Sequence, residues 1–362
     1  MPKVLLLSVL LSIAASAVGQ TPAKPEKFVV LSEFQVWADA ATPKVYEKFN
    51  KLYLTRGRCH SFMLYPHYEN YVWDVERMKH WVDEAVGLKA FNVFCMGDDT
   101  RTAQGRLFTA KGLSPKLAET YFQIVEYAHR KGLMVAVEPV GLPKPRDKKH
   151  FVAWLKTWVG PDVPKARRAD IIKLSIEWFG AFGNPPNMAY EVEAFFEAAK
   201  EVNPDVLVYV DSIGGQWKKP QPFHRWLLAQ YSGTIISHYL NVDQVDAFRE
   251  MGARNMMVQI NPCEAVLGGP SHLFLYFHET VTFLQKAMKK RVRYVSLAGV
   301  NYAYSRRDFD LFLDVIRPHL RLASNVDELR KSLVQDEITE PMTKEGVKAQ
   351  LTELREQKKK GK

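Results

Sequence analysis

Short runs rich in β-branched and aromatic residues alternate along this chain with segments whose apolar residues recur at helical spacing. Eight such runs can be counted, at residues 59–65, 91–96, 133–138, 171–178, 206–211, 234–239, 256–261 and 294–299. Strands that alternate with helices form parallel βαβ units with right-handed crossovers. Eight units of this kind close into a (β/α)8 TIM barrel. We therefore predict an α/β fold with a single barrel domain.

The helices between these runs have recognisable ends. Asp74 precedes a stretch whose apolar residues lie three and four positions apart, and Ser114 with Pro115 precedes a second stretch that stops at Gly132. A small polar residue before a helix, a proline in its first turn and a glycine after it are standard boundary signals. An open doubly wound sheet is the alternative architecture, but no glycine-rich phosphate-binding motif follows any of the eight runs. The barrel is therefore the favoured reading.

The N-terminus has the pattern of a signal peptide. Lys3 is followed by an apolar run over residues 4–17, with small residues up to Gly19. The run is too short to cross a bilayer, and no later stretch reaches the roughly 18 apolar residues that a membrane helix needs. We expect residues 1–19 to be removed on export and the mature protein to be secreted or periplasmic.

The rest of the chain divides into three parts. Residues 20–56 are expected to form an N-terminal extension, residues 57–322 the barrel and residues 323–362 a charged helical tail. The net charge of +10 includes lysines at the end of that tail. Elsewhere lysine and arginine are mixed with acids, without the basic stripe that nucleic-acid binding requires. We expect no nucleic-acid partner and no integral membrane segment, and the oligomeric state stays open.

Polar and aromatic residues gather where the predicted strands end. They are Tyr65, His67, Asp98, Asp99, Glu138, Glu177, Asp211, His238, Tyr239, Asn261 and Tyr302. In this fold the carboxyl ends of the strands carry the active site. Carboxylates and amides bind sugar hydroxyls, and aromatic rings pack on the apolar faces of the sugar ring. The sequence therefore predicts a carbohydrate as the partner, with no cofactor or metal.

Four of these strand ends resemble the α-galactosidase-like clan of glycoside hydrolases, most of all its family 36 type. The segments at 94–99, 132–139, 170–177 and 210–215 follow the clan's order of an Asp-Asp end, a Glu-Pro end, an Asp-x-Ile-Lys run and a glycine-rich turn. The resemblance implies that Asp98, Asp99 and Lys173 hold the sugar. It also implies a nucleophilic aspartate at position 175, where this chain has Ser175.

A second departure lies on the sixth predicted strand, where the clan carries its acid and this chain has His238 flanked by Ser237 and Tyr239. The fourth strand is also similar to the DxxDxDxE motif of family 18 chitinases, through Asp170 and Glu177. A serine hydroxyl cannot take the place of a carboxylate beside an oxocarbenium-like centre. The resemblance therefore implies altered chemistry at this strand.

Strand alternation puts residues 173, 175 and 177 on one side of their strand, facing the barrel axis. This makes Glu177 the best candidate for the general acid/base, with Asp211 or Glu138 as the second carboxylate. Lys173 would then lie inside the barrel, and an interior ammonium must be paired with at least one of these acids because an unpaired buried charge is costly.

Three functions fit these features. The first is an exported glycoside hydrolase that uses carboxylate acid/base chemistry. The second is a catalytically inactive carbohydrate-binding relative, since both catalytic aspartate positions of the clan are substituted. The third is a metal-dependent lyase or isomerase, in which Glu138, Glu177 and Asp211 would bind a hard cation. Lys173 argues against the third, because its ammonium would compete with the cation.

Overall fold

The structure is a computed structural model of the 362-residue chain. It describes residues 25–36, 75–96, 101–102, 105–139, 142–175, 185–212, 236–239, 244–250, 254–260, 277–297 and 312–333, with residues 349 and 352 besides.

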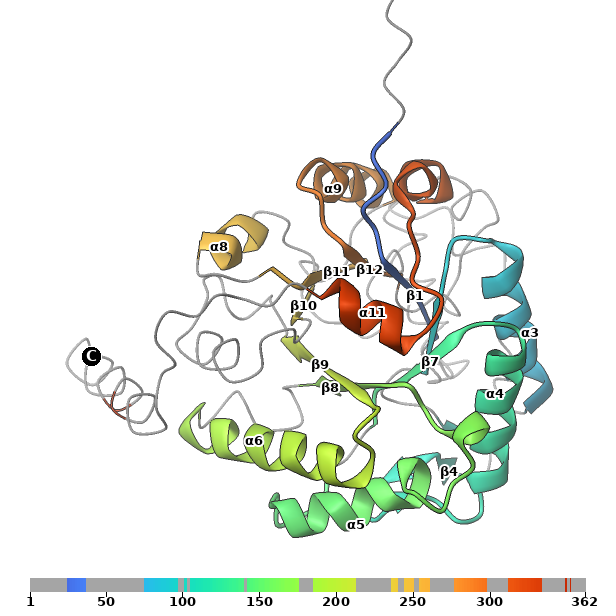
Figure 1. The fold of residues 1–362 in the computed structure, drawn as a ribbon, viewed down its shortest axis with the longest axis vertical. Coiled ribbons are helices and arrows are strands. Elements are labelled where there is room, and N and C mark those ends of the chain that lie inside the picture. Colours follow the sequence, from blue (N-terminus) through green and yellow to red (C-terminus); the bar gives the residue numbers. More distant parts are fainter. Residues whose placement is uncertain are drawn as a thin grey trace, which may run out of the picture.

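Eight parallel strands form a closed ring around a common axis (Figure 1). They are β1 (Leu31–Val36), β2 (Val93–Met96), β7 (Met134–Val137), β8 (Ile171–Ser175), β9 (Leu207–Ser212), β10 (Ile236–Tyr239), β11 (Met256–Ile260) and β12 (Tyr294–Leu297). Each strand pairs with the next along the chain, and β12 pairs with β1 to close the ring. Added around the ring, the pairing registers displace the chain by eight residues. Eight strands with this stagger define the TIM barrel, so the predicted fold class is confirmed.

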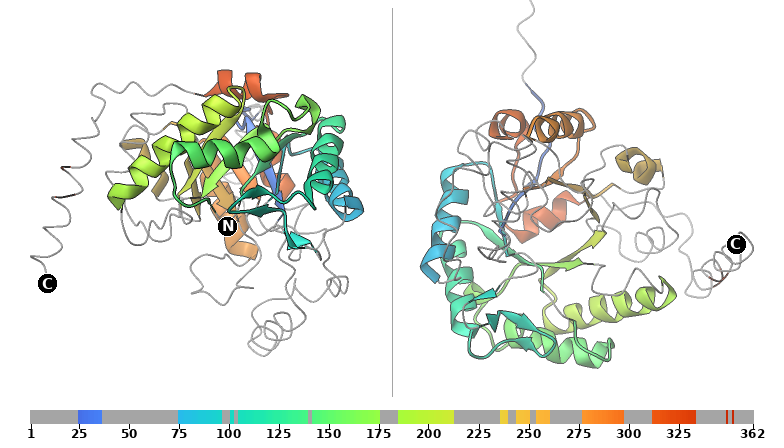
Figure 2. Two further views of the ribbon diagram at one scale, coloured as in Figure 1. Left: turned by 90° about the horizontal axis from the view of Figure 1, so that it is seen from below. Right: turned by 180° about the vertical axis from the view of Figure 1, so that it is seen from behind.

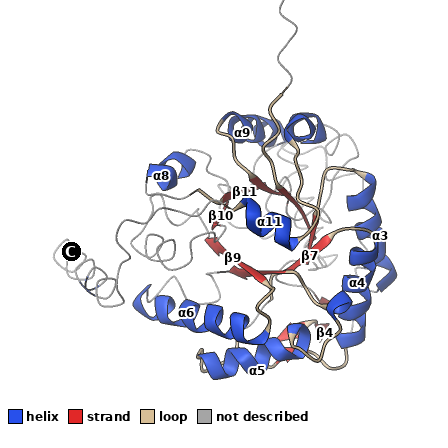
Figure 3. Ribbon diagram, viewed as in Figure 1, coloured by secondary structure: helices blue, strands red, loops and turns tan. Residues whose placement is uncertain are grey.

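Helices surround the ring (Figure 3). They are α3 (Val75–Gly87), α4 (Ala118–Arg130), α5 (Lys148–Val159), α6 (Pro185–Val202), α8 (Gln244–Glu250) and α9 (Phe277–Lys289). Outward-facing strand residues such as Phe34, Val135 and Ile172 share one buried cluster with the apolar faces of these helices. No helix in the described part of the chain is long and apolar enough to cross a membrane.

Several shorter elements lie between or after these strands and helices. Two small hairpins, β3 (Arg101–Thr102) with β4 (Gly105–Arg106) and β5 (Phe108–Thr109) with β6 (Gly112–Leu113), lie between β2 and α4. The 3-10 helices η3 (Lys165–Arg167) and η8 (Arg317–His319) and the helix α11 (Val326–Ser332) belong to later connections.

The first strand of the barrel differs from the prediction. The sequence predicts that residues 59–65 supply it, but β1 takes that place and pairs with both β2 and β12. Residues 59–65 lie outside the described residues. The expected boundary at residue 57 therefore moves back to the start of β1, within the segment predicted to be an extension. All six residues of β1 are buried, as in a strand of a parallel barrel that is covered on both faces.

The C-terminal boundary also moves. The sequence predicts a charged tail from residue 323. In the structure, however, Ala323, Leu329 and Leu333 are buried in the apolar cluster that fills the barrel interior toward the amino-terminal ends of the strands. Helix α11, which contains Leu329, lies across the amino-terminal end of the ring, in front of the strands in Figure 1 and behind them in the right-hand view of Figure 2. The start of the predicted tail is thus the floor of the barrel.

Asn92 ties this floor to the first strand. Its Oδ1 accepts a hydrogen bond from the Ser32 amide at 2.9 Å. Its Nδ2 donates to the carbonyls of Val30 at 3.0 Å and Ala323 at 2.7 Å. One buried side chain therefore satisfies backbone groups of β1 and of the segment that leads into α11.

Candidate functional site

The structure describes the predicted site in part. The side chains of Glu138 and Lys173 are described, and Asp211, His238 and Tyr239 are placed by their backbone in β9 and β10. The other predicted site residues lie outside the described residues, namely Tyr65, His67, Asp98, Asp99, Glu177, Asn261 and Tyr302. The described part of the site is therefore its base, inside the barrel.

Lys173 lies in the centre of the barrel with its side chain fully buried. Its Nζ is 3.1 Å from Oε2 of Glu138, whose side chain is 3% exposed. Nζ also donates to Oε1 of Gln35 at 3.1 Å and to Oε1 of Gln259 at 3.0 Å. The prediction that Lys173 lies inside the barrel and pairs with one of the nearby acids is confirmed, and its partner is Glu138.

Gln35 joins both members of this ion pair. Its Nε2 donates to Oε2 of Glu138 at 3.1 Å while its Oε1 accepts from Lys173. The reverse orientation of the amide would set its NH2 group against the ammonium and its oxygen against the carboxylate. The charges on both sides therefore fix the amide in one orientation.

A second buried carboxylate lies on the same strand, two residues before Gln35. Glu33 accepts hydrogen bonds from the hydroxyls of Tyr209 and of Ser296, the latter at 2.7 Å. Burial, together with the charge of Glu33, raises the pKa of Tyr209 well above its ordinary value. The phenol therefore stays protonated and continues to donate to Glu33 over the whole physiological pH range.

The ladder registers place the remaining strand-end residues. Asp211 is the partner of Ser175 on β8 and of Ser237 on β10. Tyr239 is the partner of Gln259, which faces the axis, whereas His238 is the partner of Val258, which packs on the helix side. By register, Asp211 and Tyr239 therefore occupy strand positions that are aligned with interior-facing residues of the neighbouring strands.

Sequence reasoning missed Glu33, Gln35 and Gln259. The first two lie in the segment predicted to be an N-terminal extension, and Gln259 lies two residues before the predicted end of its strand. A signal was nevertheless present, because Glu33 and Gln35 are polar residues spaced by two in a segment that also contains Leu31, Phe34 and Val36. In a strand buried on both faces, such spacing indicates a polar patch on the face toward the axis.

The described residues hold no group of three or more histidine, cysteine or acidic side chains that could bind a metal ion. Glu138, one of the three acids considered as a metal ligand, is instead paired with the Lys173 ammonium. A cation at this oxygen would have to displace a buried positive charge. The base of the site is therefore arranged around an internal ion pair.

The opposite end of the barrel has a cavity of about 330 Å³, far from the strand ends considered above. It is lined by His129, Gly132, Leu133, Met134, Lys165, Arg168, Ala169, Asp170, Asn203, Asp205, Ser324, Asn325, Val326 and Asp327. Several of its polar groups bond neighbouring chain segments. Oδ2 of Asp170 contacts Nε2 of His129 at 2.7 Å and accepts from the Val135 amide at 2.8 Å, and Arg168 donates to the carbonyls of Val163 and Pro161. These contacts are structural, since they join the starts of β7 and β8.

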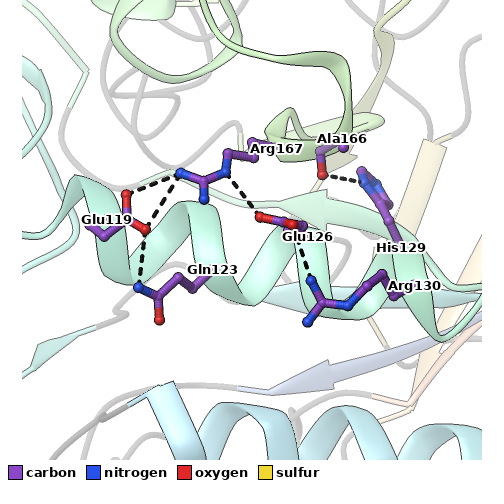
Figure 4. A network of polar contacts seen from close by, with 7 residues as sticks. All are labelled: Glu119, Gln123, Glu126, His129, Arg130, Ala166 and Arg167. Atoms are coloured by element: carbon purple, nitrogen blue, oxygen red, sulfur yellow. Dashed lines mark hydrogen bonds and ion pairs between the residues drawn. The ribbon is translucent and has the colours of Figure 1, made fainter.

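A polar network beside that cavity is also structural (Figure 4). Arg167 of η3 donates to Glu126 at 3.0 Å and to Glu119 at 3.1 Å, both on α4. Nδ1 of His129 lies 2.9 Å from the carbonyl of Ala166. The network fastens η3 onto α4 on the outer surface of the barrel and includes none of the predicted site residues.

No protein-family model matches this chain, and no characterised protein matches it by sequence. Among solved structures, the glycoside hydrolase domain of PgaB from Bordetella bronchiseptica is similar with a TM-score of 0.49 at 9% identity, covering 79% of this chain and 98% of that one. A β-mannanase from the blue mussel Mytilus edulis is similar with a TM-score of 0.47 at 10% identity, covering 84% and 99%. A truncated 3-deoxy-D-arabino-heptulosonate 7-phosphate synthase from Thermotoga maritima is similar with a TM-score of 0.37 at 11% identity, covering 82% and 88%. At these values the likeness assigns no chemistry, and the barrel rests on its own strand pairing.

Proposed function

We propose that this chain is an exported glycoside hydrolase that cleaves a glycosidic bond by carboxylate acid/base chemistry. The observation that carries the proposal is the buried Glu138–Lys173 ion pair with Gln35 and Gln259 around it. Export is inferred from the signal-peptide pattern of residues 1–19.

This cluster is not needed to build a barrel. The interior of a TIM barrel is ordinarily filled with branched apolar side chains, and a buried ion pair stabilises a fold no better than apolar packing would. Here an ion pair and two amides occupy the interior. Gln35 and Gln259 lie in the carboxyl-terminal halves of β1 and β11, Lys173 lies at the middle of β8, and Glu138 directly follows β7. Catalytic residues of this fold come from the same ends of the strands. Polar residues in the interior near the carboxyl-terminal ends of the strands therefore support a catalytic site at that end of the barrel.

In the proposed mechanism Glu177 donates the proton to the leaving oxygen and returns as the base. Glu138 or Asp211 provides the ionised carboxylate that stabilises positive charge at the sugar carbon. Asp98, Asp99, Tyr239 and the other strand-end residues would hold the sugar hydroxyls and ring faces. Ser175 would mark a lost nucleophile position rather than a serine nucleophile, because serine catalysis needs a base within hydrogen-bond reach.

The metal-dependent alternative has less support. It would need Glu138 as a ligand, and the ammonium of Lys173 already lies 3.1 Å from that carboxylate. Two positive charges at one carboxylate would repel each other strongly in a buried setting. The inactive carbohydrate-binding relative remains a separate outcome of the experiment below.

A screen of aryl glycosides and of plant and algal polysaccharides tests the proposal, with wild type beside Glu177→Gln, Ser175→Ala and the exposed control Glu76→Gln. We expect Glu177→Gln to lose about 100-fold or more in turnover, the scale of a removed acid/base, while Ser175→Ala and Glu76→Gln lose little. Near-normal turnover in Glu177→Gln would contradict the assignment. Polysaccharide binding without turnover in any protein would identify the inactive relative.

A further inference from the structure

The three polar side chains at the base of the site form a closed triangle. Oε2 of Glu138 is 3.1 Å from Nζ of Lys173 and 3.1 Å from Nε2 of Gln35, and Nζ of Lys173 is 3.1 Å from Oε1 of Gln35. Each edge joins a donor to an acceptor. The triangle connects β1, β8 and the end of β7 across the interior of the barrel.

The described contacts of the Lys173 ammonium are with buried side chains of the barrel. A lysine ammonium has three N–H groups and accepts no hydrogen bond. Two of them donate to Gln35 and Gln259, the carboxylate of Glu138 lies 3.1 Å away as an ion-pair partner, and the side chain is fully buried. A sugar hydroxyl could reach this ammonium only by displacing one of these buried partners. This geometry differs from the sugar-binding role that the resemblance to the α-galactosidase-like clan implies.

We propose that Gln35 is a positioning residue that, together with Lys173, holds the carboxylate of Glu138 ionised and in one orientation. In this arrangement Lys173 stabilises Glu138 and does not bind the sugar. This inference rests on the proposed function and deepens it. Of the two acids considered for the second carboxylate, it selects Glu138. It leaves the proton-donor role to Glu177.

The physical reason is that one oxygen of Glu138 accepts a hydrogen bond from Gln35 and lies 3.1 Å from the positive charge of Lys173. Hydrogen bonds to the charged form of a carboxylate, and a positive charge beside it, both favour that form over the protonated one. A carboxyl group held in this way is a poor proton donor and a good stabiliser of developing positive charge. The fixed amide of Gln35 adds direction, because it can only donate toward Glu138.

The test compares Gln35→Leu and Gln35→Glu with the matched control Gln259→Leu. Gln35→Leu and Gln259→Leu each remove one acceptor from Lys173. Of the two, Gln35→Leu also removes the Gln35 donor to Glu138. Gln35→Glu keeps the size and the acceptor and sets a second carboxylate beside the first. If one of the Gln35 variants does not fold, the other still tests the inference.

The readout is the titration of Glu138 in protein labelled with carbon-13 at the glutamate carboxyl, with the Glu138 signal assigned by its loss in Glu138→Gln. We expect the midpoint to move up by about one pH unit in Gln35→Leu and further in Gln35→Glu, because donors and like charges act in these directions. Gln259→Leu should leave the midpoint near that of wild type. An unchanged midpoint in both Gln35 variants, or an equal shift in Gln259→Leu, would overturn the inference.

This measurement needs no turnover, so it separates the two proposals. A shifted midpoint in a protein that cleaves no glycoside would support the triangle and count against the hydrolase. Where turnover is found, the acidic limb of the pH dependence of kcat/KM should move to higher pH in the Gln35 variants and stay in place in Gln259→Leu. An acidic limb that does not follow the Glu138 midpoint would refute the role of Glu138 as the working carboxylate.

Discussion

The ammonium of Lys173 lies 3.1 Å from the carboxylate of Glu138, and the two side chains are 0% and 3% exposed. Both charged groups are shielded from water, and they contact each other and the side-chain amides of Gln35 and Gln259. A pair of this kind is strongly coupled, because removing one member leaves the other as an uncompensated buried charge. The polar base of the site is therefore also a determinant of stability.

Lys173→Met is expected to lower the free energy of unfolding by about 3–5 kcal/mol, the usual cost of breaking a buried ion pair from one side. The double variant Lys173→Met with Glu138→Gln should recover part of this loss, since no isolated charge remains. Urea denaturation of the two single variants and the double variant measures the coupling. Additive losses would show that the two charges do not depend on each other.

Tyr209→Phe removes a hydroxyl that donates to the buried carboxylate of Glu33. We expect a loss of about 1–3 kcal/mol in the free energy of unfolding, the cost of removing a hydrogen bond to a buried charged group. Denaturation at neutral pH measures it. Phenylalanine fills nearly the same volume, so a loss close to zero would mean that the hydroxyl contributes little.

Tyr209 also gives a prediction at high pH. Burial and the neighbouring Glu33 raise its pKa well above the ordinary value of 10.0. Above pH 10 the unfolded chain therefore loses this phenolic proton while the folded chain keeps it, so the stability that Tyr209 contributes declines as the pH rises. The unfolding free energy of wild type should fall more steeply above that pH than that of Tyr209→Phe. Parallel curves for the two proteins would contradict the expectation.

His129 should make stability depend on pH near neutrality. Burial lowers the pKa of its imidazole, but the hydrogen bond and charge of Asp170 outweigh this and raise it above 6.5. The favourable contribution of protonated His129 is therefore complete below about pH 6.5 and is lost as the pH rises through the raised value. We expect the stability difference between wild type and His129→Gln to shrink over this window in urea titrations. A difference that is constant with pH would rule out the linkage.

Leu329 tests whether α11 is part of the barrel. Its side chain is fully buried with the residues that fill the barrel interior. Leu329→Ala should cost about 2–5 kcal/mol, as for other buried leucines. The exposed Lys331→Ala on the same helix is the control and should change stability by less than about 0.5 kcal/mol. Equal, small effects in both variants would restore the view that this segment is a tail.

Local patterns were sufficient to predict most of the ring. The strands that begin at Met134, Ile171, Met256 and Tyr294 lie within the predicted runs, because burial on both faces leaves an apolar signature in the sequence. The first strand is the exception, since the sequence analysis assigns it to residues 59–65 and places residues 31–36 in an N-terminal extension. Only pairing with β2 and β12 selects β1.

For the site, too, local sequence patterns predict some residues and only strand pairing identifies the others. The amino-acid sequence by itself favoured a barrel of eight βα units over an open sheet and predicted that Lys173 faces the interior beside one of three acids, because strand alternation and helix boundaries are local properties. The tertiary structure alone decided that Gln35, from the first strand, and Gln259, from the seventh, complete the contacts of Lys173. The physical reason is that closure of the ring, with its stagger of eight residues, sets which side chains meet at one level across the barrel. No local sequence pattern shows which residues of distant strands will lie at the same height in the barrel.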